Sequence, residues 1–185
     1  MLPLAFNLRG AKVLVIGAGV VGARKAAQLC EAGARVHVTS TEVRASLPDG
    51  LARLEVRAYQ RGDLASFALV VSATGRDEVN DEIVDEARER NIWLNVVDDP
   101  ERSSFYFMAL HREGDVSVAV TTSGASPALA RELRTRIAAT LPANLAHVAD
   151  ALRHERALLH QRGVSTEGVD WRARLVEALG EQSDT

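Results

Sequence analysis

Residues 12–22 read KVLVIGAGVVG, and this stretch decides the fold of the chain. A short apolar strand runs into the pattern Gly-x-Gly-x-x-Gly, and a helix that begins on the last glycine continues to Ala32. Gly17 allows a tight turn off the strand, and Gly19 lets backbone amides approach a pyrophosphate. Gly22 lets the helix pack closely on the sheet. The stretch therefore predicts a dinucleotide site, the alternative being a strand-to-helix turn without a ligand.

The first half of the chain alternates strands with helices, which is typical of a parallel sheet covered on both faces. Asp77 is expected to cap one of these helices. The expected strands are 12–16, 35–39, 54–58, 67–73 and 92–97, and the expected helices are 23–32 and 77–90. We therefore expect an α/β protein that opens with a Rossmann-like parallel sheet.

The pattern changes after this sheet. Two strand-like runs, 104–110 and 116–122, are joined by a hairpin connection and do not alternate with helices. Ser126 is expected to cap a helix from Pro127 to about 140. Further helices are expected at 142–161 and 169–179, with frayed residues after them. The expected domains are a Rossmann-like NAD-binding domain at 1–108, a small α+β domain at 109–145 and a helical domain at 146–185.

Composition and charge exclude several classes of protein. The formal net charge of the 185 residues is −3, which argues against a general nucleic-acid binder. No apolar run approaches the roughly 18 residues that cross a bilayer, and residues 1–6 do not read as a secretory signal. A single cysteine, Cys30, allows no internal disulfide and fits a reducing cytoplasm. The five histidines form no recognised metal pattern, so no metal site is expected.

Ligands of open α/β sheets bind beyond the carboxyl ends of the strands. An acidic residue there commonly contacts the ribose 2′-OH of NAD, but here hydroxyl residues come first and Glu42 follows. NAD is favoured over NADP because no arginine directly follows the strand, Arg44 being the nearest. The candidate cofactor-binding residues are Gly17, Gly19, Val20, Val21, Gly22, Thr39, Ser40, Thr41, Glu42 and Thr74.

Two further segments carry candidate chemistry. Asp98 and Asp99 follow the strand at 92–97, where a carboxylate could accept a proton beside the cofactor or could only start a turn before Pro100. The hydroxyl-rich turn at 121–127 leads into a helix N-terminus, where it could bind carboxylates or only cap the helix.

Four motifs occur in order along the chain: GAGxVGxRK at 17–25, NVVDDP at 95–100, SF at 104–105 and SGASPALAR at 123–131. Over about residues 2–160 the chain resembles the precorrin-2 dehydrogenase family, which includes the N-terminal module of sirohaem synthase. The resemblance implies a cytoplasmic enzyme that oxidises precorrin-2 to sirohydrochlorin and passes a hydride to NAD. It also implies a homodimer formed through 109–145, the dimerisation domain. Some members insert ferrous iron as well, so sirohydrochlorin ferrochelatase activity is a further expectation.

The resemblance also assigns roles to residues. The key aspartate of the family falls on Asp98, and the hydroxyl of its small-residue loop falls on Thr122. A separate protein is expected to make precorrin-2, because the helical C-terminal part is too short for a methyltransferase. The rival reading is a non-catalytic NAD-binding regulatory module, which would need the glycine loop but neither NVVDDP nor SGASP. The candidate substrate-binding residues are Thr122, Ser123, Ser126 and Arg131, with Arg102 and Arg112 in nearby segments.

Overall fold

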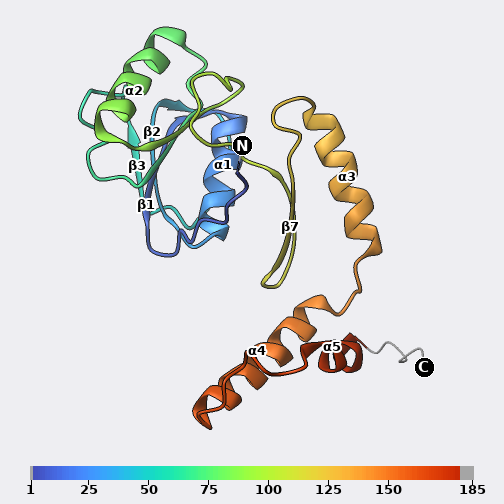
Figure 1. Cartoon of the computed structure of the whole chain (residues 1–185). Helices are drawn as coiled ribbons and strands as arrows, with labels where there is room; N and C mark the ends of the chain where they lie inside the picture. The colour runs from blue at the N-terminus through green and yellow to red at the C-terminus, as the bar shows by residue number, and fades with distance from the viewer. Residues whose placement is uncertain (1, 180–185) are drawn as a thin grey trace. The chain divides into compact units, whose positions relative to one another are not determined.

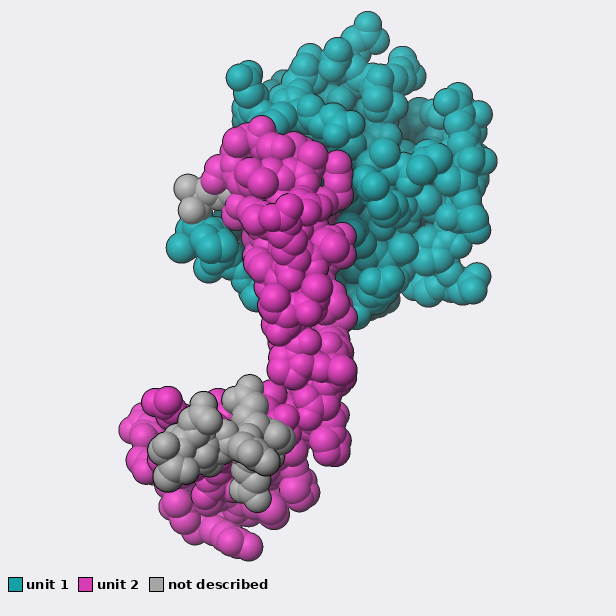
Figure 2. Space-filling view, turned by 90° about the vertical axis from the view of Figure 1, so that its right-hand side faces the viewer, with its two compact units in different colours: residues 1–106 teal, residues 107–185 magenta. Residues whose placement is uncertain are grey.

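The computed structural model describes residues 2–179 and divides into two compact units, Met1–Tyr106 and Phe107–Thr185 (Figure 2). The predicted boundary between a first and a second domain after residue 108 lies close to this division. The further division at 145, into a dimerisation domain and a helical domain, stays a prediction. The predicted fraying of the last residues lies outside the described residues. No helix within 2–179 has the length and apolar character needed to cross a membrane.

The first unit is built on a sheet of parallel strands, as the alternating pattern predicts (Figure 1). The order of the strands is β3-β2-β1-β4-β5, so the chain reverses direction across the sheet between β1 and β4. Ligands of such sheets bind at this reversal, beyond the carboxyl ends of the strands. The strands are β1 (Lys12–Ala18), β2 (Arg35–Val43), β3 (Arg53–Val56), β4 (Leu69–Ser72) and β5 (Trp93–Val96).

Helices α1 (Val20–Glu31) and α2 (Asp77–Arg90) complete the core of the first unit. Leu14 and Ile16 of β1 belong to an apolar cluster with Ile83 of α2. Because successive residues of a strand point to opposite faces, Val13 and Val15 face the other way, and both are fully buried. Helix α1 contacts β1, β2 and β4 and buries three of its apolar side chains. Two covered faces explain why β1 reads as an uninterrupted apolar run.

The boundaries of two helices differ from the predictions. Helix α1 begins at Val20 rather than on Gly22, because Gly19 has extended dihedral angles and is the N-cap. Arg76, not Asp77, is the N-cap residue of α2, so the predicted cap is wrong. Asp77 is the first residue of that helix, and its carboxylate accepts a hydrogen bond from Arg102 instead.

The predicted strand at 104–110 is wrong in its first half. Ser103 and Ser104 lie against β5 and bond its backbone: the Leu94 N–H donates to Ser104 Oγ at 2.8 Å, and the Val96 N–H donates to Ser103 Oγ at 2.9 Å. The Ser104 N–H also donates to the Leu94 carbonyl at 2.8 Å. These residues therefore finish the edge of the first sheet, and the next strand begins only at Ala109.

The second unit holds a two-stranded antiparallel sheet of β6 (Ala109–Glu113) and β7 (Val116–Val120). The turn between them, Gly114-Asp115, is shorter than the predicted 111–115 connection. Helix α3 (Pro127–Thr140) contacts both strands, and its Ser126 cap is as predicted, with Ser126 Oγ accepting from the Leu129 N–H at 3.1 Å. Helices α4 (Leu145–Gln161) and α5 (Trp171–Leu179) contact each other and begin two to three residues later than predicted.

Candidate nucleotide and catalytic site

The three glycines of the loop between β1 and α1 are present for different physical reasons. Gly17 has φ +107°, and a Cβ there would lie 2.4 Å from the Ala73 carbonyl oxygen. A Cβ at Gly22 would lie 1.9 Å from the Gly17 carbonyl oxygen. These two glycines are therefore required by internal packing, whether or not a ligand binds.

Gly19 is different, because a Cβ built on it meets no atom within 4 Å. Its φ of −78° suits any residue, and it makes no side-chain cap for α1. Neither sterics nor backbone conformation within the chain calls for glycine at this position. The open space lies at the N-terminus of α1, where backbone N–H groups and the helix dipole favour an anion. The loop therefore fits a dinucleotide pyrophosphate, whose close approach a Cβ would obstruct.

The residues at the end of β2 divide into buried and exposed ones. Strand β2 continues to Val43, so Thr39 to Glu42 lie within it rather than after it. Thr39 and Ser40 are buried, and Ser40 Oγ accepts from the Ala18 N–H at 3.0 Å while donating to the Glu42 carbonyl at 2.7 Å. Ser40 therefore joins the end of β1 to β2. Thr41 and Glu42 are exposed, and Glu42 is paired with Arg44.

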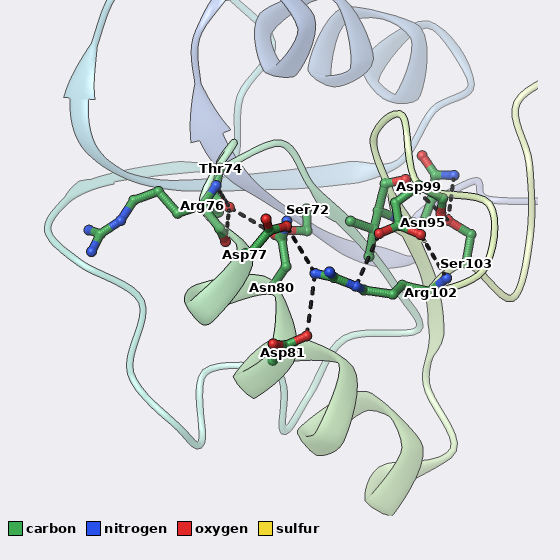
Figure 3. A network of polar contacts seen from close by, with 11 residues as sticks. Ser72, Thr74, Arg76, Asp77, Asn80, Asp81, Asn95, Asp99, Arg102 and Ser103 are labelled. Atoms are coloured by element: carbon green, nitrogen blue, oxygen red, sulfur yellow. Dashed lines mark hydrogen bonds and ion pairs between the residues drawn. The ribbon is translucent and has the colours of Figure 1, made fainter.

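The loop from β4 to α2 is fixed by a buried amide. Asn80 Oδ1 accepts hydrogen bonds from the Ser72 hydroxyl at 2.7 Å and from the Thr74 hydroxyl at 2.8 Å (Figure 3). The Arg76 N–H donates to Thr74 Oγ1 at 3.2 Å. Thr74 thus lies at the carboxyl end of β4, the neighbour of β1, with its hydroxyl held by α2.

The two carboxylates in the turn after β5 lie in different surroundings. Asp98 has φ +61° and an exposed side chain, in a tight turn closed by the Asp99 N–H donating to the Val96 carbonyl at 3.2 Å. Asp99 accepts from the Arg102 N–H at 3.0 Å and pairs with Arg102 Nε at 3.0 Å. Asp99 therefore takes the turn-stabilising role, and Asp98 is presented to solvent.

Lys25 of α1 is a residue to which the sequence analysis gave no role. Burial, and then the neighbouring charge of Arg24, lower the pKa of the Lys25 ammonium to about 8, whereas Asp98 acts on that pKa in the opposite direction. An electrostatic interaction thus links the helix after the glycine loop to the turn after β5. Such a perturbed group beside a nucleotide loop is typical of functional sites. The RK pair in the 17–25 motif was the signal that could have identified it.

The hydroxyl-rich turn of the second unit uses most of its hydroxyls internally. Thr122 Oγ1 accepts from the Ser126 N–H at 3.0 Å and donates to the Ser126 carbonyl at 3.1 Å. Ser126 Oγ caps α3. Ser123, with φ +53°, and Arg131 both have exposed side chains. Of the four candidate substrate-binding residues, Ser123 and Arg131 are therefore the two that this turn leaves exposed to solvent.

Residues 4–109 match a family described as putative NAD(P)-binding, and residues 113–140 match the sirohaem biosynthesis protein central family. The chain belongs to the putative NAD(P)-binding family. The predicted nicotinamide dinucleotide cofactor is thereby confirmed.

Relatives of this NAD(P)-binding chain confirm the resemblance seen in its motifs. It is 39% identical to siroheme synthase of Methylococcus capsulatus over 159 residues. The aligned stretch covers 82% of this chain and 34% of the relative. It is 37% identical over 183 residues to siroheme synthase of Tolumonas auensis, covering 97% of this chain and 36% of the relative. The chain thus spans about a third of the length of these curated relatives.

A solved structure shares the fold. The structure of SirC, precorrin-2 dehydrogenase, superposes with a TM-score of 0.74 at 23% identity, covering 97% of this chain and 88% of that chain. The predicted α/β class with a parallel sheet is therefore confirmed. Within residues 2–179, no group of three or more His, Cys, Asp and Glu side chains is placed to hold a metal ion.

Proposed function

We propose that this chain is a dehydrogenase that oxidises precorrin-2 to sirohydrochlorin with NAD as the hydride acceptor. The observation that carries the proposal is the succession, in one chain, of an NAD(P)-binding region at 4–109 and a sirohaem biosynthesis central region at 113–140. The names of the relatives agree with this assignment. The reaction belongs in the cytoplasm, where Cys30, the single cysteine, remains a thiol.

The first unit supplies the cofactor site of this proposal. Backbone N–H groups at Val20, Val21 and Gly22 would hold the pyrophosphate over the open space at Gly19. Thr41 and Glu42 are the exposed residues of β2 that would contact the adenosine ribose. Arg44 is paired with Glu42, which disfavours a ribose 2′-phosphate and hence NADP. When bound, NAD would supply the nicotinamide ring that accepts the hydride.

We assign Asp98 as the base that accepts the proton released by the substrate. Oxidation removes a hydride and a proton from the reduced macrocycle, and an exposed carboxylate can accept that proton. Asp99 is less suited to this role because its carboxylate already binds Arg102. Asp98 acts to raise the pKa of Lys25, a residue of the helix that follows the glycine loop, which supports this assignment.

The second unit supplies the expected substrate and dimer contacts. The carboxylates of a tetrapyrrole need cationic and hydrogen-bond donors, and Arg131 and Ser123 are exposed. Leu129, Leu133 and Ile137 lie four residues apart on α3 and are 48%, 38% and 38% exposed, which favours a homodimer formed through this helix.

An anaerobic spectrophotometric assay with precorrin-2 and NAD tests the proposal. We expect NADH to form together with sirohydrochlorin, and Asp98→Asn to lower turnover about 10²- to 10⁴-fold with NAD affinity unchanged. The control is Glu101→Gln, which neutralises an exposed carboxylate of the same turn and should leave turnover unchanged.

Tight NAD binding without oxidation of precorrin-2 would favour the non-catalytic regulatory module instead. A second arm of the assay adds ferrous iron to sirohydrochlorin and measures whether the chain also inserts the metal. Loss of turnover in Asp98→Asn together with an equal loss of folded protein would assign Asp98 to the turn rather than to the chemistry.

A further inference from the structure

We infer that Arg102 is a positioning residue of the reaction, because it clamps the turn that carries Asp98 to the first turns of α2. The inference rests on the proposed function only in assigning Asp98 to the chemistry. The turn comprises residues 96–103, between the end of β5 and the serines that bond this strand. It is called the Asp98 turn below.

Arg102 contacts both the Asp98 turn and helix α2. On the side of the turn, its backbone N–H donates to Asp99 Oδ1 and its Nε pairs with Asp99 Oδ2, each at 3.0 Å. On the side of the helix, its Nη1 lies 3.2 Å from Asp77 Oδ1 and 3.3 Å from Asp81 Oδ1 (Figure 3). One guanidinium therefore bridges carboxylates from two separate elements, a geometry that its planar set of donors suits.

The Asp98 turn needs such a restraint. The φ of +61° at Asp98 is a left-handed conformation, which an L residue adopts at an energetic cost. Ser103 holds the base of the turn, with its hydroxyl accepting from the Val96 N–H and donating to the Asp99 carbonyl at 2.7 Å. These bonds fix the base of the turn to β5, and the Val97 N–H donates to the Ser72 carbonyl at the end of β4 at 2.9 Å. The Arg102 side chain adds the restraint toward α2.

Helix α2, whose carboxylates bind Arg102, is itself bonded to the carboxyl end of β4. Asn80, one residue before Asp81, accepts hydrogen bonds from Ser72 at the end of β4 and from Thr74 in the following loop. The clamp thus joins the Asp98 turn to the loop that carries Thr74. Movement of the turn against β4 would displace Asp98 relative to any ligand held at that edge of the sheet.

The partners of Arg102 indicate a local role rather than a role in overall stability. The side chains of Asp77 and Asp81 are 85% and 67% exposed, and ion pairs at such exposed positions contribute little to the stability of a fold. Loss of the guanidinium should therefore leave the sheet intact and free the turn. The same contacts argue against Arg102 as a ligand for substrate carboxylates, since three carboxylates of the chain already surround it.

Two substitutions test the clamp in the full-length chain. Arg102→Ala removes every side-chain contact, and Arg102→Lys keeps the charge but not the fork that spans two elements. We expect Arg102→Ala to lower kcat about 10- to 100-fold with the KM for NAD unchanged, and Arg102→Lys to recover only part of this loss. Amide hydrogen exchange in the Asp98 turn should be faster in both variants, and exchange in β1 and β4 unchanged.

The matched control is Arg61→Ala, because Arg61 also ties a loop to α2, through Glu89, at an exposed position. It should change neither kcat nor exchange in the Asp98 turn. Wild-type kcat and wild-type exchange in Arg102→Ala would overturn the inference. So would a higher KM for precorrin-2 at unchanged kcat, which would make Arg102 a substrate ligand. If wild-type protein does not oxidise precorrin-2, the proposed function fails, and hydrogen exchange alone still decides whether Arg102 restrains the turn.

Discussion

The substitution Gly19→Asp should raise the stability of the protein and weaken its binding of NAD by about two to four orders of magnitude. The Cβ of residue 19 meets no atom within 4 Å, and the backbone there is extended, with φ −78°. Aspartate is among the best N-cap residues, whereas glycine makes no side-chain cap at this helix. Capping and reduced freedom of the unfolded chain together should add about 0.5–1 kcal/mol to the free energy of unfolding.

The expected loss of NAD affinity follows from the same geometry. The carboxylate would occupy the open space at the N-terminus of α1 and would take the N–H groups that a pyrophosphate needs. Losing about two charge-assisted hydrogen bonds, each contributing about 1.5–3 kcal/mol, weakens binding about 10²- to 10⁴-fold. Calorimetric titration with NAD measures this loss, and thermal unfolding measures stability on the same samples.

Variants of the loop separate the causes. Gly19→Ala adds bulk without charge and should weaken NAD binding less than Gly19→Asp does. Gly17→Ala and Gly22→Ala should instead lower stability, because their Cβ atoms would lie 2.4 Å and 1.9 Å from backbone oxygens. Wild-type NAD affinity in Gly19→Asp would refute the reasoning, since it would place the pyrophosphate away from this loop.

Two further outcomes are expected. Burial raises the pKa of Glu86, but hydrogen bonds from Tyr59 and Arg90 outweigh it, and the pKa lies below its usual 4.5. Its contribution to the free energy of unfolding is therefore present above about pH 4.5 and is lost as the pH falls through the lowered pKa. Glu86→Gln should lower the free energy of unfolding by about 2 kcal/mol at pH 7. Urea denaturation at a series of pH values should show a smaller loss of stability toward acid pH in this variant than in wild type. Light scattering at micromolar concentration should show a homodimer for wild type and a monomer for Leu133→Asp, whereas the control Leu158→Asp on α4 stays dimeric. A monomeric wild type would contradict the interface on α3.

Signals confined to a few neighbouring residues were readable in the sequence. The run at 12–22 predicted β1, the glycine loop and α1, because an apolar strand, a positive φ at Gly17 and close packing at Gly22 are requirements of adjacent backbone. Ser126 before Pro127 predicted the start of α3 for the same reason. The parallel direction of the strands also followed, since strands that alternate with helices are joined by crossover connections.

Partners that are distant in the sequence were decided only by the tertiary structure. Asp77 looked like a helix cap, but the fold brings Arg102 to it from 25 residues away. Residue 104 looked like the start of a strand, yet the hydroxyls of Ser104 and of the preceding Ser103 bond β5.

The sequence by itself therefore determined the parallel sheet and the place of the glycine loop, because local sterics and hydrophobic periodicity depend on adjacent residues. The tertiary structure alone decided which of two adjacent carboxylates is restrained and which is exposed. It also brought Asp98 close enough to Lys25 for the carboxylate to act on the pKa of that ammonium group. The pairing of charged side chains from separate elements leaves no periodic pattern in a sequence, and only the packing of β5, α1 and α2 settles which of them meet.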